Sequence, residues 1–211
     1  MKKVLALVIM LSGMACAFSQ TAGKEPETRY TSAITVGYNY SGGCYKADEG
    51  DGLDYGINSF KLNYFGITSG GILFNAGVKL GAFDPEIDPG YDFEVQRKAA
   101  AGIELGAGYA FVNNKKAKLA LEAVYEYSFQ NYEIDSTEGT GFDSWEVKVS
   151  GIGVDLTGFL YFSNWFGFHS ALGLRYMSGT VGVWDHVLLE TVEHDCSSMQ
   201  VEFNAGISFK F

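Results

Sequence analysis

The chain has 211 residues, with 25 acidic against 15 basic side chains, a formal net charge of −10, 27 glycines, 3 prolines and 15% aromatic residues. A length near 200 residues is that of one domain, and the acidic balance argues against nucleic-acid binding, because phosphate contacts need lysine and arginine. Many aromatic residues and glycines with little proline favour extended β structure over disorder.

The first predicted element is a secretory signal peptide over residues 1–19. Lys2 and Lys3 precede an apolar run from Val4 to Met14, and the small residues of Ala15-Cys16-Ala17 follow. Cleavage after Ala17 or Ser19 fits this pattern. It removes two of the 15 basic residues, so the mature chain carries 13 basic against 25 acidic side chains, a net charge of −12.

Two alternatives apply to this first segment. A membrane-anchor helix needs about 20 apolar residues, whereas Ser12-Gly13 interrupts the run early. Cys16 is also a candidate for lipidation, although Gly13 stands where a lipoprotein signal usually has leucine. The polar residues 20–31, which include Pro26, are predicted to be a short leader, and residues 32–211 a single β domain.

Eight segments of this β domain alternate between apolar and other residues with a period of two, as strands with one apolar face do. In the third segment, for example, Ile72, Phe74, Ala76, Val78 and Leu80 share one face. The segments are 32–40, 57–67, 72–83, 97–112, 117–129, 145–162, 165–183 and the C-terminal strand 199–211.

Short and long links alternate strictly between these segments. The links at 68–71, 113–116 and 163–164 are short and rich in turn residues. The links at 41–56, 84–96, 130–144 and 184–197 are long and polar. An antiparallel meander gives this pattern when all its long loops lie at one end. Transmembrane β-barrels have this asymmetry, and eight is a common small strand number for them.

The sixth segment, 145–162, breaks the pattern once. Val147 and Val149 have the opposite parity from Ile152 and Val154. One interpretation is a β-bulge at Ser150-Gly151 that resets the register. The other is that Glu146 and Lys148 already lie above the membrane.

The face opposite the apolar one is rich in glycine, with isolated charges. A soluble eight-stranded barrel such as a lipocalin is the alternative fold, but it turns its apolar face inward. Glycine weakens strands, so small residues beside single charges favour a crowded lumen in which acids and bases pair. The predicted lumen charge network is Lys61, Lys79, Glu104, Glu122, Glu126, Asp155, His169, Arg175, Glu202 and Lys210.

The last strand ends on an aromatic residue in mid-alternation. Its apolar face is expected to contact lipid, because lipid accepts a large charge-free surface and water does not. Aromatic residues at strand ends would form girdles at the two interfaces. The apolar positions of this strand include Phe203, Ala205, Ile207, Phe209 and Phe211.

In pattern, the mature chain resembles the small outer-membrane β-barrels, such as the transmembrane domain of outer-membrane protein A and the OmpX, opacity-protein and OmpW types. The resemblance implies a Gram-negative-type outer membrane, four long external loops and three short periplasmic turns, with 20–31 as a periplasmic leader. In that class a final phenylalanine after alternating apolar residues is similar to the signal read by the barrel-assembly machinery. Phe203, Ala205, Ile207, Phe209 and Phe211 match it. Expected partners are therefore outer-membrane lipid, the assembly machinery and a surface ligand of unknown chemistry.

Two cysteines, Cys44 and Cys196, remain after signal cleavage. Cys44 follows the first strand by a few residues, and Cys196 just precedes the eighth. These strands are neighbours in a closed barrel, and the compartment permits disulfides. We therefore expect a Cys44–Cys196 disulfide, with two free thiols as the alternative.

We predict no catalytic, cofactor-binding or metal-binding residues, and no enzymatic activity. His169 and Ser170 are adjacent, so they point to opposite faces of a strand, unlike the His-x-Ser segment of a lipid A deacylase of this barrel class. His186 and His194 lie among loop acids without tight zinc-ligand spacing. The acidic run 48–54 lacks the closing glutamate of a calcium loop.

Three functions compete at this point. The first is a structural or surface-interaction protein with a charge-plugged lumen, since eight strands leave room only for side chains. The second is a narrow conduit or carrier for small hydrophobic molecules, as in OmpW-like barrels. The third is a lipid-modifying barrel enzyme, which needs a serine, histidine and acid set on its lipid-facing rim.

Overall fold

The computed structural model describes residues 30–47, 53–85, 93–96, 99–136, 142–185 and 190–211. The predicted signal peptide 1–19 lies outside these residues. No helix within the described ranges is long and apolar enough to cross a membrane. Their strands are β1 (Thr31–Ala47), β2 (Leu53–Ile67), β3 (Ile72–Pro85), β4 (Phe93–Gln96), β5 (Ala99–Asn113), β6 (Ala117–Ser136), β7 (Phe142–Tyr161), β8 (Phe166–Asp185) and β9 (Glu190–Lys210).

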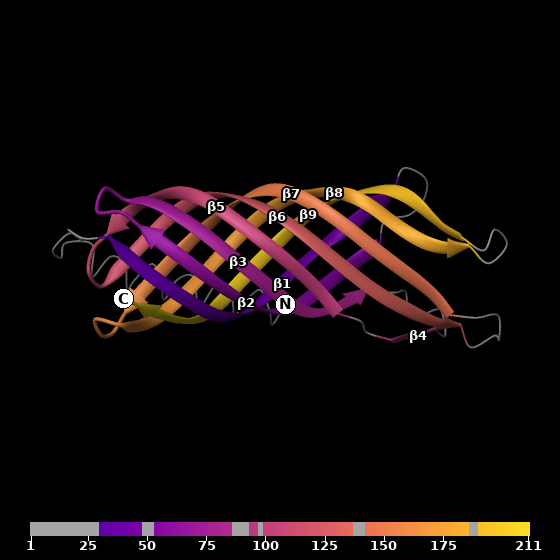
Figure 1. Ribbon diagram of the computed structural model, residues 1–211, viewed down its shortest axis with the longest axis horizontal. Helices are drawn as coiled ribbons and strands as arrows, with labels where there is room; N and C mark the ends of the chain where they lie inside the picture. The colour runs from indigo at the N-terminus through magenta and orange to yellow at the C-terminus, as the bar shows by residue number, and fades with distance from the viewer. Residues whose placement is uncertain (1–29, 48–52, 86–92, 97–98, 137–141, 186–189) are drawn as a thin grey trace.

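Eight of these strands form a closed antiparallel up-and-down barrel, as the sequence predicts. Each pairs with the next along the chain, β3 pairs with β5, and the pairing of β1 with β9 closes the ring. The strands are tilted around the long axis of the barrel (Figure 1). The short β4 precedes β5 and pairs with residues 133–136 of β6, along the same edge of β6 that β5 occupies.

The C-terminal end of β9 is held on both sides. The Lys210 amide donates to the Trp165 carbonyl, 2.8 Å away. The Phe211 amide donates to the Ser32 carbonyl at 3.0 Å, and the Ser32 amide donates back at 3.3 Å. The last residue therefore continues the β1–β9 ladder.

Apolar side chains cover the outside of the barrel. Successive side chains of a strand point to opposite faces, and the outward ones are large and exposed, as with Phe60 (71%), Ile152 (68%) and Leu80 (63%). Their neighbours along the same strands, Ser59, Lys61 and Lys79, are buried inside. The fold is thus inverted relative to a soluble barrel, and its outer surface is one that hydrocarbon accepts and water does not.

The strands extend well beyond the predicted segments into the long polar links. β6 continues to Ser136 and β7 begins at Phe142, although the sequence predicts a loop over 130–144. Likewise β1 reaches Ala47 and β9 begins at Glu190. The outward apolar side chains form a belt around the barrel, here called the apolar band. Above this band the outward side chains have no lipid to contact, so the alternation disappears while the hydrogen-bonded ladder continues.

β7 crosses the irregular stretch of the sixth segment without a bulge. Its registers with β6 and β8 run through Ser150 and Gly151 without a shift. Val147 and Val149 keep the inward parity and are 1% exposed. The outward Glu146 and Lys148 form a half-exposed ion pair of 2.8 Å. The bulge interpretation is therefore wrong, and the apolar band ends below Lys148.

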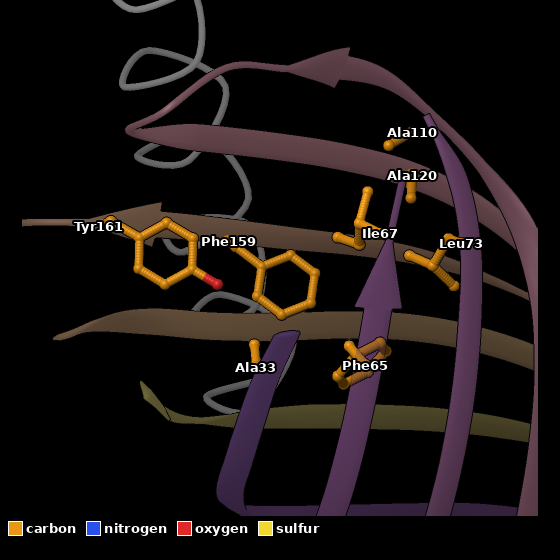
Figure 2. Packing of buried hydrophobic residues seen from close by; sticks show 8 residues of the cluster. All are labelled: Ala33, Phe65, Ile67, Leu73, Ala110, Ala120, Phe159 and Tyr161. Carbon is orange, nitrogen blue, oxygen red and sulfur yellow. The ribbon is translucent and has the colours of Figure 1, made fainter. Parts of the chain in front are cut away.

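The lumen is filled in layers. Figure 2 shows the apolar cluster at the short-turn end, where Phe65, Ile67 and Phe159 point into the barrel. A second apolar cluster, with Tyr55, Val147, Val149 and Met177, lies at the opposite, loop end. The inward residues between the two clusters are mostly polar or charged. This polar layer is where the candidate site lies.

Candidate functional site: the charged layer of the lumen

Eight of the ten residues predicted for the lumen network meet at mid-height of the barrel. They come from seven strands, and none is more than 6% exposed. Several distant segments of the chain thus supply one buried cluster, which we call the charged layer. It consists of Lys61, Lys79, Glu104, Glu122, Glu126, Asp155, Arg175 and Glu202.

Arg175 lies at the centre of the charged layer, with a side chain that is 0% exposed. Its Nη2 contacts Glu104 Oε2 and Asp155 Oδ2, each at 2.7 Å. Its Nη1 contacts Glu202 Oε2 at 2.5 Å and also Glu126 Oε2. The planar guanidinium fork presents donors in fixed directions that match carboxylates, and here one fork serves four of them.

Two lysines complete the positive charge of the layer. Lys61 Nζ lies 2.8 Å from Glu104 Oε2 and 2.9 Å from Glu202 Oε1. Lys79 Nζ lies 2.7 Å from Glu126 Oε2, contacts Glu202 Oε2, and is 3.6 Å from Glu104 Oε2. Glu104, Glu126 and Glu202 therefore each contact at least two cations.

Some of these ion pairs cross the lumen, whereas those of Arg175 with Asp155 and Glu202 join neighbouring strands. Lys61 faces Lys79 directly across β2–β3, and Glu104 faces Glu126 across β5–β6. Like charges directly opposite one another destabilise a sheet, so each needs a countercharge from another strand. The Arg175–Glu104 contact, from β8 to β5, spans two intervening strands. The charged layer thus joins strands that are not neighbours across the lumen.

Glycines make room for the layer. Arg175 faces Gly153 in the β7–β8 register, and Asp155 faces Gly173. A Cβ on Gly153 would lie 2.4 Å from Arg175 Cγ, and one on Gly173 would lie 2.3 Å from Asp155 Oδ1. Each other member also has a glycine opposite it on a neighbouring strand. The glycines at the inward positions of the strands therefore leave the space that the long charged side chains occupy.

Glu122 differs from the other four acids. Its Oε2 accepts a hydrogen bond from Asn75 Nδ2 at 3.0 Å, and its Oε1 contacts the Thr157 hydroxyl. Asn75 Nδ2 also donates to Glu104 Oε1 at 3.0 Å. Among the described residues no ion pair involves Glu122, whereas each of the other four acids contacts Arg175. Glu122 thus belongs to the layer through neutral polar partners.

His169 and Lys210 lie outside the charged layer, which corrects their assignment to the network. The buried His169 ring packs between Phe65 and Phe159, with ring centroids 5.2 and 5.0 Å away. Lys210 Nζ donates to the Lys115 carbonyl at 3.1 Å and lies 4.8 Å from the Tyr161 ring centroid. Both follow the inward parity, but at the level of the short-turn end, where the interior is aromatic.

Cys44 and Cys196 are not joined by a disulfide, so that prediction is wrong. Cys44 pairs in register with Met199 of β9, whereas Cys196 pairs with Ala47 of β1. The two thiols are therefore three register positions apart and on opposite faces of the sheet, because Met199 points outward and Cys196 inward. At the level of Cys196, which is above the apolar band, burial raises the pKa of its thiol to about 11.

Carboxylate oxygens of Glu104, Glu126 and Glu202 lie within 4.8 Å of one another. Three convergent carboxylates are a familiar arrangement for a hard cation. Here Lys61, Lys79 and Arg175 supply the positive charge instead. The acidic run 48–52 and His186 fall outside the described residues, and His194 is exposed on β9.

Three inward residues of the lumen, Asn75, Thr157 and Lys118, were not predicted from the sequence as members of the lumen network. Asn75 and Thr157, which hold Glu122, share the inward parity of Gly77 and Asp155. Lys118 is fully buried on the inward face of β6 and donates to Asn113 Oδ1 at 2.7 Å. Parity alone was enough to find all three, because each stands two or four residues from a predicted member on the same strand.

No protein-family model matches the sequence, and no curated protein matches it. Solved structures do match the fold. Neisserial surface protein A is 15% identical, with a TM-score of 0.50 over 89% of this chain and 100% of that one. A major outer membrane protein from Thermus thermophilus is 13% identical, with a TM-score of 0.56 over 84% and 99%. The outer membrane protein AlkL, solved in lipid bilayers, is 12% identical, with a TM-score of 0.54 over 89% and 93%.

The fold is that of the small outer-membrane β-barrels. The predicted class resemblance is therefore confirmed at the level of architecture. At these identities the comparisons show the fold alone.

Proposed function

We propose that this chain is an outer-membrane protein whose barrel anchors a structural or surface-interaction role, with a lumen closed to solutes. Three features support this location. The predicted signal peptide directs export, the outward apolar band fits a bilayer, and the described residues form a barrel in which every strand of the ring is paired on both sides.

The observation that carries the closed lumen is the four-carboxylate contact of the fully buried Arg175. A conduit needs a continuous path, whereas these contacts join opposite walls at mid-height and apolar clusters fill the lumen on either side. A barrel of this strand number is also only wide enough for its own side chains. The closed lumen is thus favoured over the carrier for small hydrophobic molecules.

The terminal strand supports a proposed route into the membrane. Ile207 and Phe211 are exposed on the outer face, and with Phe203, Ala205 and Phe209 they present the alternating surface expected of an assembly signal. We propose that the barrel-assembly machinery reads this strand, and that the long-loop end then faces outward, where an unidentified surface ligand would bind.

Two measurements test this proposal. Fractionation of cells that express the protein should place it in the outer membrane, and recovery from the soluble or inner-membrane fraction would contradict the location. Proteoliposomes carrying the refolded protein should not swell in isosmotic sugar solutions. Rapid swelling, at the level given by a general porin, would contradict the closed lumen.

A further inference from the structure

The charged layer does not balance. Its five carboxylates, Glu104, Glu122, Glu126, Asp155 and Glu202, face three cations, Lys61, Lys79 and Arg175. An isolated ionised carboxylate is very costly to bury. Inside a closed barrel this excess negative charge is costly, and a bound positive charge would lower this cost.

The contacts single out where the excess lies. Glu104, Glu126, Asp155 and Glu202 each contact Arg175, and three of them also contact a lysine. Glu122 contacts Asn75 and Thr157, which are neutral. Glu122 also stands directly opposite Asp155 in the β6–β7 register. Two inward carboxyls that face each other cannot both ionise without a cation between them.

We propose that Glu122 is a proton-binding site, at which the folded barrel takes up one proton from water and holds it on the Glu122 carboxyl. Asp155 is the ionised partner, because its Oδ2 already contacts Arg175 Nη2 at 2.7 Å. The Thr157 hydroxyl, which can accept a hydrogen bond as well as donate one, is the acceptor for the added proton. Four carboxylates then face three cations in the charged layer.

Within the described part of the chain, the cations that face the lumen around Glu122 have other partners. Glu126 and Lys118 share its strand, Glu104 comes from β5, and Asp155 from β7. Across the lumen stand Lys61 on β2, Lys79 on β3, Arg175 and His169 on β8, and Glu202 on β9. The three cations of the layer are engaged with the other four acids. Lys118 points toward the short-turn end, where Asn113 Oδ1 accepts its hydrogen bond.

The proposal has a defined pH signature. Above about pH 5 an exposed glutamate of the unfolded chain is ionised, so the folded state holds one more proton than the unfolded state. Stability then falls as pH rises, and the unfolding equilibrium constant grows up to about tenfold per pH unit for one proton. This change concerns the chemistry of the lumen, and it is expected whether or not the barrel conducts.

The test compares two conservative variants of the refolded barrel in denaturant titrations between about pH 5.5 and 8.5, a range above the ordinary pKa of glutamate. Glu122→Gln should be at least as stable as the wild type at the alkaline end and should lose most of the pH dependence. Glu126→Gln is the matched control on the same strand. It removes an acid that contacts Lys79 and Arg175, so it should be less stable and should keep the pH dependence.

A spectroscopic measurement decides the question even if Glu122→Gln fails to fold. At about pH 7.5 the exposed acids are ionised, so the infrared spectrum of the wild-type barrel should show the C=O stretch of one protonated carboxyl. A folded Glu122→Gln should lack this band. A wild type without the band, or a Glu122→Gln variant that retains the band or the full pH dependence, would overturn the proposal.

Discussion

Arg175 is the residue on which the charged layer depends most. Arg175→Ala leaves Glu104, Glu126, Asp155 and Glu202 without their shared partner, and removing one member of a buried ion pair costs about 3–5 kcal/mol. Denaturant unfolding of the refolded protein should show a loss of this size. Lys148→Ala is the control, since its ion pair with Glu146 is half exposed and contributes little. Equal, small effects of the two variants would contradict the central role of Arg175.

Gly153 tests the space that the layer needs. Gly153→Ala places a Cβ 2.4 Å from both Arg175 Cγ and the Leu174 carbonyl oxygen. Overpacking of this kind costs about 1–3 kcal/mol, to be measured as a lowered denaturation midpoint. Gly70→Ala is the matched control in a turn, because its Cβ would meet only Thr68 Oγ1, at 3.9 Å. If both variants are as stable as the wild type, the glycine pattern has another origin.

At the residue scale the sequence reveals whether a side chain points into or out of the barrel, but not its level along the barrel axis. Period-two parity correctly places Arg175 and its four acids inside the barrel, and it does the same for His169 and Lys210. It cannot show that these two lie at the aromatic level near the short turns, because height depends on strand tilt and register. Asn75, Thr157 and Lys118 have the same inward parity. Asn75 and Thr157 are neutral, and Lys118 lies at the start of its strand, so none of the three belonged to the predicted charge pattern.

At the scale of the element, β9 is the strand whose sequence says most about assembly. Phe211→Asp puts a charge on the outer face of the last β1–β9 pair and should lower the amount of folded protein in the outer membrane. Phe211→Tyr, which keeps an aromatic ring at an interface, should assemble like the wild type. Quantitative immunoblotting of membrane fractions measures both. Normal assembly of Phe211→Asp would contradict the assembly-signal interpretation.

The relative register of β1 and β9 also fixes the state of the cysteines. Cys44 and Cys196 lie on opposite faces, so mass spectrometry after unfolding without reductant should find both thiols alkylated. In the folded protein Cys196 should react slowly, because it is buried. An unalkylated species lighter than the reduced chain by the mass of two hydrogens would show the disulfide and contradict this register.

The ends of the strands are the feature of the elements that the sequence does not predict. Alternation marks each strand only where lipid requires apolar side chains on one face. Beyond that band, residues 133–135 of β6 pair with residues 142–144 of β7 without any apolar pattern. The parity of Val147 and Val149 looked irregular for the same reason. They fill the lumen above the charged layer, while Glu146 and Lys148 face outward in water.

At the scale of the whole molecule, the barrel is a closed wall around a filled interior. Apolar side chains close both ends of the lumen, and ion pairs between non-adjacent strands hold the middle. In the proposed function the loop end faces a partner, the outer face contacts lipid, and solutes have no continuous path through the lumen. Permeation is therefore the property that depends most directly on this interior.

Single-channel recording of the refolded wild-type protein in a planar bilayer tests the closed lumen most directly. We predict no stable conductance steps for the wild type, because Arg175, Lys61 and Lys79 tie opposite walls together. Arg175→Ala, if it folds, should conduct small ions under conditions in which the wild type does not. Stable, sizeable conductance steps from the wild-type barrel would contradict the closed lumen and favour the conduit.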